Sequence, residues 1–228
     1  AQAVESMASL TPDDGAGIIR TIALELERLA NHIGDLGALC MDVAFIAPAN
    51  YFGRIRGDFL NLSLLICGNR FGKGLVRPGG VRFSLDDDIR RTLDERLKEL
   101  RPQVIHVLDL IFSASTVRAR FEGCGRVSLE DADHLGLVGP AGRASGMAYD
   151  ARRCFPTEHY THLQIPENTG SSGDVYDRAR IRRDEIVQSL DIIQSLIQNP
   201  VTTSPVDGNM PELAADSLAV TINEAWRG

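Results

Sequence analysis

An apolar stripe with helical spacing runs through residues 18–36 and constrains the fold more than any other feature of the sequence. The stripe consists of Ile18, Ile22, Leu26, Leu29, Ile33 and Leu36. Apolar residues three and four positions apart lie on one face of an α-helix, so the pattern predicts a helix over residues 12–39. Thr11 is the expected cap of this helix, and Pro12 suits its first position.

Other stretches repeat this pattern. Long helices are expected over residues 48–67, 84–112 and 174–199. Gly68 is expected to end the first of these, while Ser84 and Asp174 are expected to cap the second and the third. Shorter helices are expected over residues 1–9, 128–136 and 211–218.

Long helical stripes with little strand alternation predict a mainly α fold, a helical bundle with long irregular loops. Residues 136–174 contain too many glycines and prolines for regular structure. A long irregular segment of this kind is usually functional or disordered. We expect a single helical domain over residues 1–228, in which residues 201–228 form an irregular tail.

The charge balance excludes one class of function. Among the 228 residues, 24 are Lys or Arg and 31 are Asp or Glu, which gives a net charge of −7. A protein that binds nucleic acid through its overall field needs clustered positive charge, so no nucleic-acid partner is expected. Apolar runs stay well below the roughly 18 residues that a membrane helix needs, so no direct membrane span is expected.

The cysteines are scattered along the chain, at Cys40, Cys67, Cys124 and Cys154. They form no close Cys-x-x-Cys pair, the spacing typical of structural zinc, redox and iron–sulfur sites. We interpret them as reduced and mostly buried thiols, which favours a cytosolic compartment. A zinc loop that uses Cys154, His159 and His162 is a weaker alternative, because no fourth ligand is evident.

Two glycine-rich motifs resemble functional loops but fail on spacing. The stretch GNRFGKG at 68–74 is one residue short of a phosphate-binding P-loop, and Gly74 stands where a Ser or Thr should hold magnesium. The stretch GRASG at 142–146 lacks the central serine of a nucleophile elbow. The first is therefore interpreted as a structural turn.

Glu25, Arg28 and His32 lie three and four positions apart on one face of the helix expected at 12–39. They form either an exposed ion pair within the helix, worth about 0.3–0.5 kcal/mol, or a polar cluster packed against another element. The last helix poses the same choice with Arg178, Arg182, Arg183, Asp184 and Glu185. His106 is expected to be a packing residue. Spacing alone does not decide between these alternatives.

Separate blocks of the sequence resemble one family of redox subunits. The blocks are IIRTIALELERLANHIGDLGALCMDVAF, NRFGKGLVRPGGVRFSL, GLVGPAGRASGMAYDARRCFPTEHY and GDVYDRARIRRDEIVQSLDIIQSLIQNP. In this order they resemble the large subunit of membrane-bound nickel–iron hydrogenases of the formate hydrogenlyase type, and the related 49-kDa subunit of respiratory complex I. Ordered blocks over about half of a chain are more specific than any short motif.

The resemblance implies a set of site residues. The polar positions that match the family are Glu25, Arg28, His32, Asp42, Arg143, Asp150 and Arg152. In the hydrogenases, two Cys-x-x-Cys pairs hold nickel and iron. In complex I, the corresponding cavity binds the quinone headgroup. Neither the cysteine pairs nor the quinone-binding segment is found in this sequence, so it resembles a central piece of a longer chain that holds no metal and is inert alone.

The family also implies partners and a place in the cell. The loop GPAGRASGMAYDARR, with Ala144, and the stretch EHYTHLQIPENTG favour the hydrogenase branch. The parent is then expected to transfer electrons beside an iron–sulfur small subunit and membrane-arm subunits, peripheral on the cytoplasmic face of the membrane. Self-association of the isolated domain is also expected. The alternative is a non-catalytic structural or assembly module of such a complex.

Overall fold

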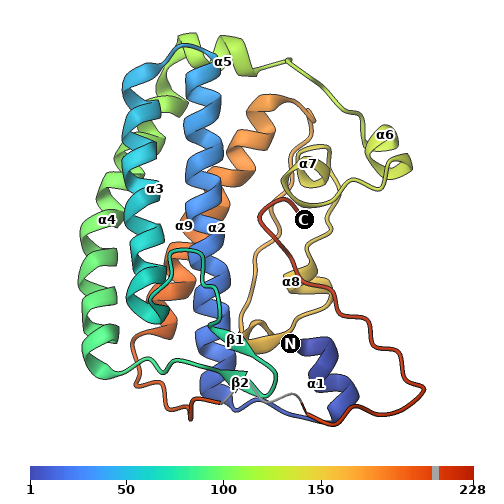
Figure 1. The fold of residues 1–228 in the computed structure, drawn as a ribbon. Helices are drawn as coiled ribbons and strands as arrows, with labels where there is room; N and C mark the ends of the chain where they lie inside the picture. Colours follow the sequence, from blue (N-terminus) through green and yellow to red (C-terminus); the bar gives the residue numbers. More distant parts are fainter. Residues whose placement is uncertain (207–210) are drawn as a thin grey trace.

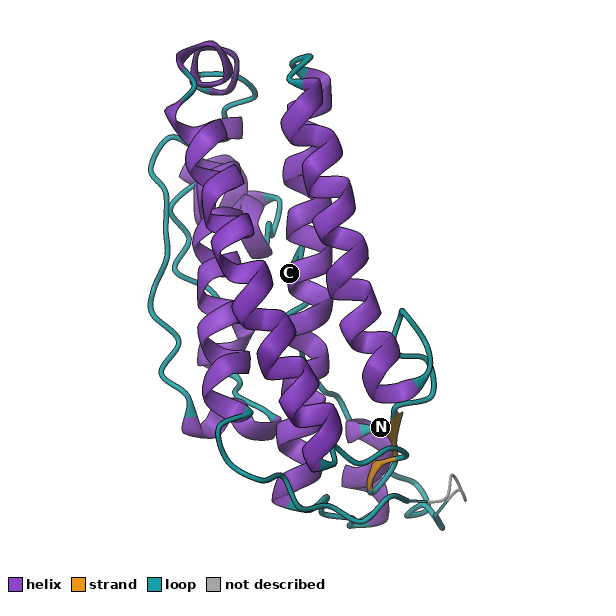
Figure 2. Cartoon of the chain, turned by 90° about the vertical axis from the view of Figure 1, so that its left-hand side faces the viewer, coloured by secondary structure: helices purple, strands orange, loops and turns teal. Residues whose placement is uncertain are grey.

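The computed structural model describes residues 1–206 and 211–228 and is mainly α-helical, as the sequence predicts. Its long helices are α2 (Asp14–Asp42), α3 (Ile46–Cys67), α4 (Asp87–Ser113) and α9 (Val175–Leu196). They stand side by side as a bundle (Figures 1 and 2). No helix among the described residues is long and apolar enough to cross a membrane.

The helix ends agree with the sequence in part. Asp174 caps α9 and Gly68 ends α3 with a φ of 70°, as predicted. The expected caps of the other two long helices are wrong. Asp13 rather than Thr11 caps α2, and Asp86 rather than Ser84 caps α4, each by accepting the backbone N–H three residues ahead. A carboxylate directly before the helix is best placed to accept hydrogen bonds from these N–H groups. Its negative charge also interacts favourably with the positive end of the helix dipole.

Helix α2 is the centre of the bundle because it packs against both α3 and α9. The predicted stripe of α2 is buried apart from its first member, and it meets fully buried Phe52 and Phe59 of α3. Two glycines bring the helices close together. A Cβ atom at Gly37 would lie 3.0 Å from Phe52 Cβ, and one at Gly34 would lie 2.9 Å from Arg56 Cδ. A larger residue at position 37 would press on Phe52 of α3, and one at position 34 would displace the Arg56 side chain.

Small elements cover one flank of the bundle and lie at both of its ends, with α5 (Ser115–Phe121) at the top and the β hairpin at the bottom of Figure 1. The other helical ones are α1 (Gln2–Ala8), α6 (Leu129–His134), α7 (Gly139–Ala144), α8 (Ala151–Cys154) and the 3₁₀ helix η1 (Glu158–His162). Strands β1 (Val76–Arg77) and β2 (Gly80–Val81) form an antiparallel hairpin. The segment at 136–174 is therefore a series of short helices joined by turns, and it lies against α2 and α9.

The structure corrects two further expectations. Residues 211–218 form a single turn rather than a helix. Leu218 of this stretch and Val220 just after it are 91% and 78% exposed, so the stretch buries no apolar face that would hold a helix against the bundle. His106 is exposed on α4 and is not a packing residue. Residues 201–206 and 211–228 contain neither helix nor strand.

Candidate functional site

A group of buried polar side chains lies between α2, α9, the segment of α7 and α8, and the end of the chain. We call it the buried charge network. Its members are Glu25, Arg28, His32, Arg143, Asp150, Arg152, Tyr160, Glu185, Ser189 and Glu224. Each member is at most 5% exposed. Charged groups at this depth are stable only when they are paired and hydrogen-bonded, so their contacts define the site.

Glu25 of α2 is completely buried and is the most enclosed carboxylate of the network. Tyr160 Oη and Ser189 Oγ donate hydrogen bonds to it, the latter at 2.5 Å. Arg28 Nε lies 3.4 Å and Arg152 Nη1 lies 3.5 Å from its oxygens. Burial alone would raise its pKa, but these cations and hydroxyls outweigh burial, and the pKa of Glu25 lies below its ordinary value. It is therefore ionised at neutral pH.

Glu185 of α9 joins α2 to the α7 segment. One of its oxygens lies 2.8 Å from His32 Nε2, and the other accepts a hydrogen bond from Arg143 at 2.5 Å. The hydrogen bond from His32 and the charges of Arg143 and Arg152 hold the pKa of Glu185 well below its ordinary value, despite burial. Burial, together with the charges of Arg28 and Arg182, outweighs the effect of Glu185 and holds the pKa of His32 below its ordinary value. His32 is therefore neutral at pH 7 and donates from Nε2, and its Nδ1 has no partner among the described residues.

Arg143 of α7 bridges carboxylates from distant parts of the chain. Its Nη1 lies 2.8 Å from Glu224, while its Nη2 contacts Glu185. Asp150 holds the neighbouring Arg152 at 2.7 Å, and it also accepts the Arg152 backbone N–H as the cap of α8. Charge-assisted hydrogen bonds from Arg143 thus tie the α7–α8 segment to α9 and to the stretch around Glu224, and such bonds are roughly twice as strong as neutral ones.

The end of the chain completes the network. Arg28 donates hydrogen bonds to the backbone carbonyls of Glu224 at 2.8 Å and Ala225 at 3.0 Å. The Glu224 side chain also accepts the backbone N–H of Ala151 at 2.8 Å. This irregular segment is therefore anchored at two points, by its backbone carbonyls to Arg28 and by the buried Glu224 carboxylate to Arg143 and the Ala151 N–H.

The structure brings together all of the family-matched residues except Asp42. This residue is exposed at the last position of α2 and contacts no member of the network. Of the alternatives for Glu25, Arg28 and His32, the exposed ion pair is wrong, since all three are buried against α9 and the α7–α8 segment. The charged residues of α9 lie in two environments. Glu185 is buried in the network, whereas Arg182 lies outside it and pairs with Asp35 at 3.1 Å.

Sequence reasoning missed Tyr160, Ser189 and Glu224, and it missed a second buried group. Arg20 of α2 is 3% exposed and binds Glu5 of α1, Glu158 of η1 and the carbonyls of the β1–β2 hairpin. One signal was available for it. Arg20 is the sole charged residue in residues 15–24, and a charge in such a stretch is rarely buried without a partner.

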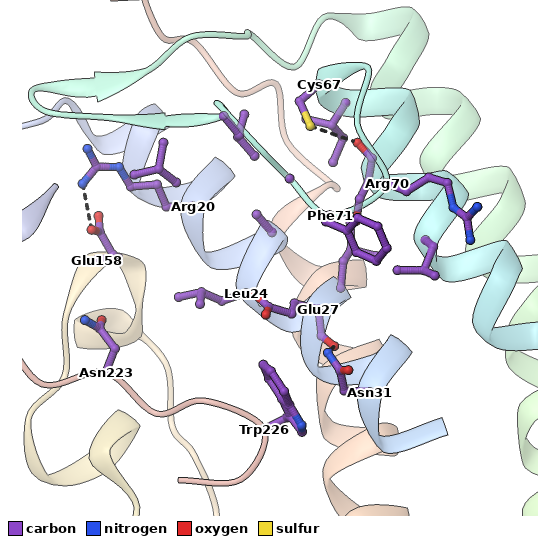
Figure 3. A pocket seen from close by; sticks show the side chains of 18 of the residues that line it. Arg20, Leu24, Glu27, Asn31, Cys67, Arg70, Phe71, Glu158, Asn223 and Trp226 are labelled. Atoms are coloured by element: carbon purple, nitrogen blue, oxygen red, sulfur yellow. Dashed lines mark hydrogen bonds and ion pairs between the residues drawn. The ribbon is translucent and has the colours of Figure 1, made fainter. Parts of the chain in front are cut away.

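A cavity of about 490 Å³ lies along a neighbouring face of α2 (Figure 3). Leu24 and Trp226 supply apolar walls, and Glu27, Asn31 and Arg70 supply polar groups. Apolar walls with a few polar groups are typical of spaces that take small organic molecules. The glycine-rich turn after α3 forms part of its rim, with positive φ angles at 72 and 74 that fit the predicted structural turn.

The thiols and the imidazoles are distributed differently from the sequence expectations. Cys40 and Cys67 are buried, and burial raises the pKa of Cys40 to about 11, but Cys124 and Cys154 are exposed. Only half of the thiols are therefore buried. Within the part of the chain that the structure describes, one group of side chains could hold a metal ion, and it consists of Asp14, His159 and His162. Cys154 does not belong to it, so the ligand set of the zinc-loop alternative is wrong.

Comparison with known proteins finds one family. The model of the family "Respiratory-chain NADH dehydrogenase, 49 Kd subunit" matches residues 42–221. An NADH-quinone oxidoreductase subunit of Clostridium beijerinckii is 33% identical over 212 residues, which cover 93% of this chain and 57% of that protein. NADH-quinone oxidoreductase subunit 4 of Thermus thermophilus is 33% identical over 214 residues, 93% of this chain and 52% of that protein.

The chain thus spans about half the length of the curated relatives that it matches. A third relative, an NADH-quinone oxidoreductase subunit of Chloroflexus aurantiacus, is 31% identical over 211 residues, 90% of this chain and 51% of that protein. The family match runs through α3, α4 and α9, and it includes the α7–α8 segment that carries Arg143, Asp150 and Arg152. The chain belongs to the family of the 49-kDa subunit of respiratory-chain NADH dehydrogenase.

Proposed function

We propose that this chain is the helical core of a redox subunit that works in a membrane-associated complex of the NADH-quinone oxidoreductase type, in which electrons reach a quinone. The observation that carries the proposal is the convergence of the family-matched residues in the buried charge network. Family membership and the names of the relatives supply the class of reaction. The alternative is that the parent protein belongs to the hydrogenase branch and reacts with hydrogen instead of a quinone.

The described residues do not fit a nickel–iron centre. Nickel held by thiolates needs cysteines that converge on one point. Here Cys40 and Cys67 are buried in α2 and α3, while Cys124 and Cys154 are exposed in other segments, and no cysteine belongs to the metal-type group. Metal chemistry of that kind would require ligands from outside the described residues. The family and the NADH-quinone oxidoreductase relatives favour the quinone branch for the proposal.

Alone, the chain is proposed to be inert, since the network is built as a scaffold. Each of its carboxylates has at least one arginine partner within 4.0 Å, so none is left as an unpaired base. Its neutral histidine is oriented by Glu185 and is shielded from solvent. This complete pairing also favours the second candidate, a structural or assembly module, and the experiment below distinguishes the two.

The partners are proposed to be an iron–sulfur small subunit and membrane-arm subunits, with the complex peripheral on the cytoplasmic face. Exposed apolar side chains lie around the segment that the network holds in place. Among them, Leu135 is 71% and Phe155 is 52% exposed, and Leu218 at 91% belongs to the terminal stretch. Exposed apolar groups in this number are characteristic of surfaces that meet other proteins. In the absence of partners, the same surface should promote self-association.

The test is to isolate the natural protein from its host membranes, without oxygen and in mild detergent. The proposal predicts that an iron–sulfur subunit co-purifies and that the preparation reduces a short-chain quinone with NADH or a reduced carrier as donor. Iron–sulfur partners without any reductase activity would support the assembly module instead. Stoichiometric nickel with hydrogen uptake would move the assignment to the hydrogenase branch. Purification as a lone protein would refute the proposal.

Variants connect this test to the network. Glu185→Gln removes the charge between His32 and Arg143, and it should reduce the amount of assembled complex that is recovered. Glu99→Gln is the matched control, because Glu99 is an exposed glutamate on α4 that also pairs with an arginine. Equal recovery of the two variants would show that the network does not support assembly.

A further inference from the structure

We propose that Asp14, His159 and His162 form a binding site for a divalent transition metal, with Zn²⁺ as the natural probe. One ligand atom of each residue lies within 4.8 Å of those of the other two. The site is separate from the buried charge network and plays no part in the proposed redox function. Two imidazoles and one carboxylate are a ligand set that zinc and related first-row ions favour.

The local fold explains why the two histidines face each other. They belong to η1, a 3₁₀ helix, in which side chains three residues apart are eclipsed. Their ring centroids are accordingly 5.0 Å apart, at an angle of 53°. The Glu158 backbone, at a φ of 52°, and the hydrogen bond from the His159 N–H to Thr21 Oγ1 fix the start of η1 against α2. The imidazoles are thus directed to the first turn of α2, where Asp14 stands.

The distance between His159 and Asp14 suits two ligands of one metal ion better than a direct hydrogen bond. His159 Nδ1 lies 3.6 Å from Asp14 Oδ1, which is too long for a hydrogen bond. Two ligands of one tetrahedral zinc ion, each about 2.1 Å from the metal, are about 3.4 Å apart. His159 Nδ1 is also buried and has no hydrogen-bond partner among the described residues. An ion between the two groups would satisfy both.

The neighbouring charges leave Asp14 available as the ligand. Asp13 is engaged as the cap of α2 and by Thr203, and Glu158 is bound by Arg20 and Gln2. Asp14 is largely exposed, with 78% of its side chain accessible, and His162 is exposed as well. Small rotations of these two side chains would therefore close the ligand distances at little cost. The fourth position would be open to solvent.

An ion in this site would connect η1 to the start of α2. The same short helix carries Tyr160 into the buried charge network and Glu158 into the Arg20 group. Because the outer ligands are accessible, the ion would exchange with the surrounding solution. The bound ion would therefore stabilise the contact between η1 and α2, because a ligand that binds only the folded state raises the free energy of unfolding.

The experiment is zinc analysis of the natural protein after equilibration with micromolar Zn²⁺ and removal of excess ion. Wild type should retain one zinc more than Asp14→Asn and His162→Ala, and these variants should bind it at least about tenfold more weakly. Zinc should raise the melting temperature of wild type more than that of either variant. His134→Ala is the matched control, because His134 is an exposed histidine on α6 outside the site.

His162 is exposed, so its replacement should leave the fold intact, which circular dichroism checks. Zinc-edge X-ray absorption supplies a second readout. The wild-type spectrum should contain a component from two imidazoles that is missing in His162→Ala. Equal zinc content and equal thermal shifts in wild type, the two ligand variants and His134→Ala would overturn the proposal and leave only adventitious surface binding.

Discussion

Helices α2 and α4 each contain an arginine and a glutamate three positions apart, but one pair is buried and the other is exposed. Glu25 and Arg28 of α2 are three residues apart and are buried, with 3.4 Å between their charged groups. Arg96 and Glu99 of α4 are also three residues apart, at 2.8 Å, and about half of each side chain is accessible to solvent. The shorter pair is the exposed one, so distance does not rank these interactions.

The difference arises from what surrounds each helix. Helix α2 is covered by α3, α9 and η1, whereas α4 lies at the edge of the bundle and has a solvent-facing side. An exposed pair gains little, because water screens it and two long side chains lose freedom. A buried group of charges has already lost its hydration, so removing one partner leaves another charge without compensation. Position in the fold, rather than spacing, therefore sets the energetic role of a charge.

The largest effect is expected at Arg143. Replacing it by Met removes the arginine that lies nearest to both Glu185 and Glu224, while keeping much of the side-chain volume. The free energy of unfolding should fall by about 3–5 kcal/mol, as for other buried pairs that lose one member. Urea unfolding of the natural protein measures this value. Arg96→Met on α4 is the control and should change stability by less than about 0.5 kcal/mol; similar losses in both would abolish the contrast.

A smaller effect is expected for Glu25→Gln. The amide keeps the shape and can still accept from Tyr160 or Ser189, but it removes the charge that balances Arg28 and Arg152. A loss of about 1–3 kcal/mol is expected, the usual cost of poorly satisfied buried groups. Denaturant midpoints provide the measurement. If Glu99→Gln on α4 costs as much, burial is not the reason.

The pH dependence should also separate the two regions. Burial holds the folded pKa of His32 below its ordinary value of 6.5, so the unfolded chain binds more protons and stability falls as the pH drops below 6.5. The loss is at most about 1.4 kcal/mol per pH unit for one proton. Melting temperatures between pH 7.5 and 5 test this. His32→Gln should flatten the curve, whereas His134→Gln on α6 should not.

The carboxylates act in the same direction at lower pH. The pKa values of Glu25 and Glu185 lie below the ordinary value of 4.5, so their contribution is present above pH 4.5 and is lost as the pH falls through their folded pKa values. A second decline in stability is therefore expected below pH 4.5. A stability curve without this decline would mean that the network carries no net stabilisation.

The smallest effect belongs to α4 itself. A double-mutant cycle on Arg96 and Glu99 should give a coupling energy of about 0.5 kcal/mol or less, and added salt should reduce it further. The same cycle on Glu25 and Arg28 should give a larger value that salt hardly changes, since the pair is buried. Coupling energies of equal size and equal salt dependence would contradict the comparison.

Much of the bundle could be predicted from the sequence, because the helices depend on the spacing of apolar residues and on capping residues close by in the chain. The stripe of α2 and the ends of α3 and α9 depend on spacing and on one glycine or one acid. The caps at Asp13 and Asp86 were harder, because several neighbouring residues can cap and the outcome depends on which one stands directly before the helix. Such choices are decided within a few residues.

The site could be predicted only in part, because its members come from segments far apart in the sequence. The resemblance to a family identified Arg143, Asp150 and Arg152, although nothing in the local pattern links them to α2. Glu224 had no signal at all, since it lies in a stretch without periodicity and reaches Arg143 across 81 positions of sequence. Long-range pairing of this kind is a property of the packed fold and cannot be found from spacing.

The anchoring of the chain end by Glu224 has a consequence for the order of folding. The Glu224 side chain pairs with Arg143, 81 residues away, and its backbone carbonyl accepts from Arg28, 196 residues away. Contacts of such long range form only after nearer ones have reduced the cost of loop closure. The irregular stretch around Glu224 should therefore dock last and be the first part of the described fold to detach. Stopped-flow measurements on Glu224→Gln should show faster unfolding at an unchanged refolding rate. The contacts of Glu224 would then control the kinetic lifetime of the folded state.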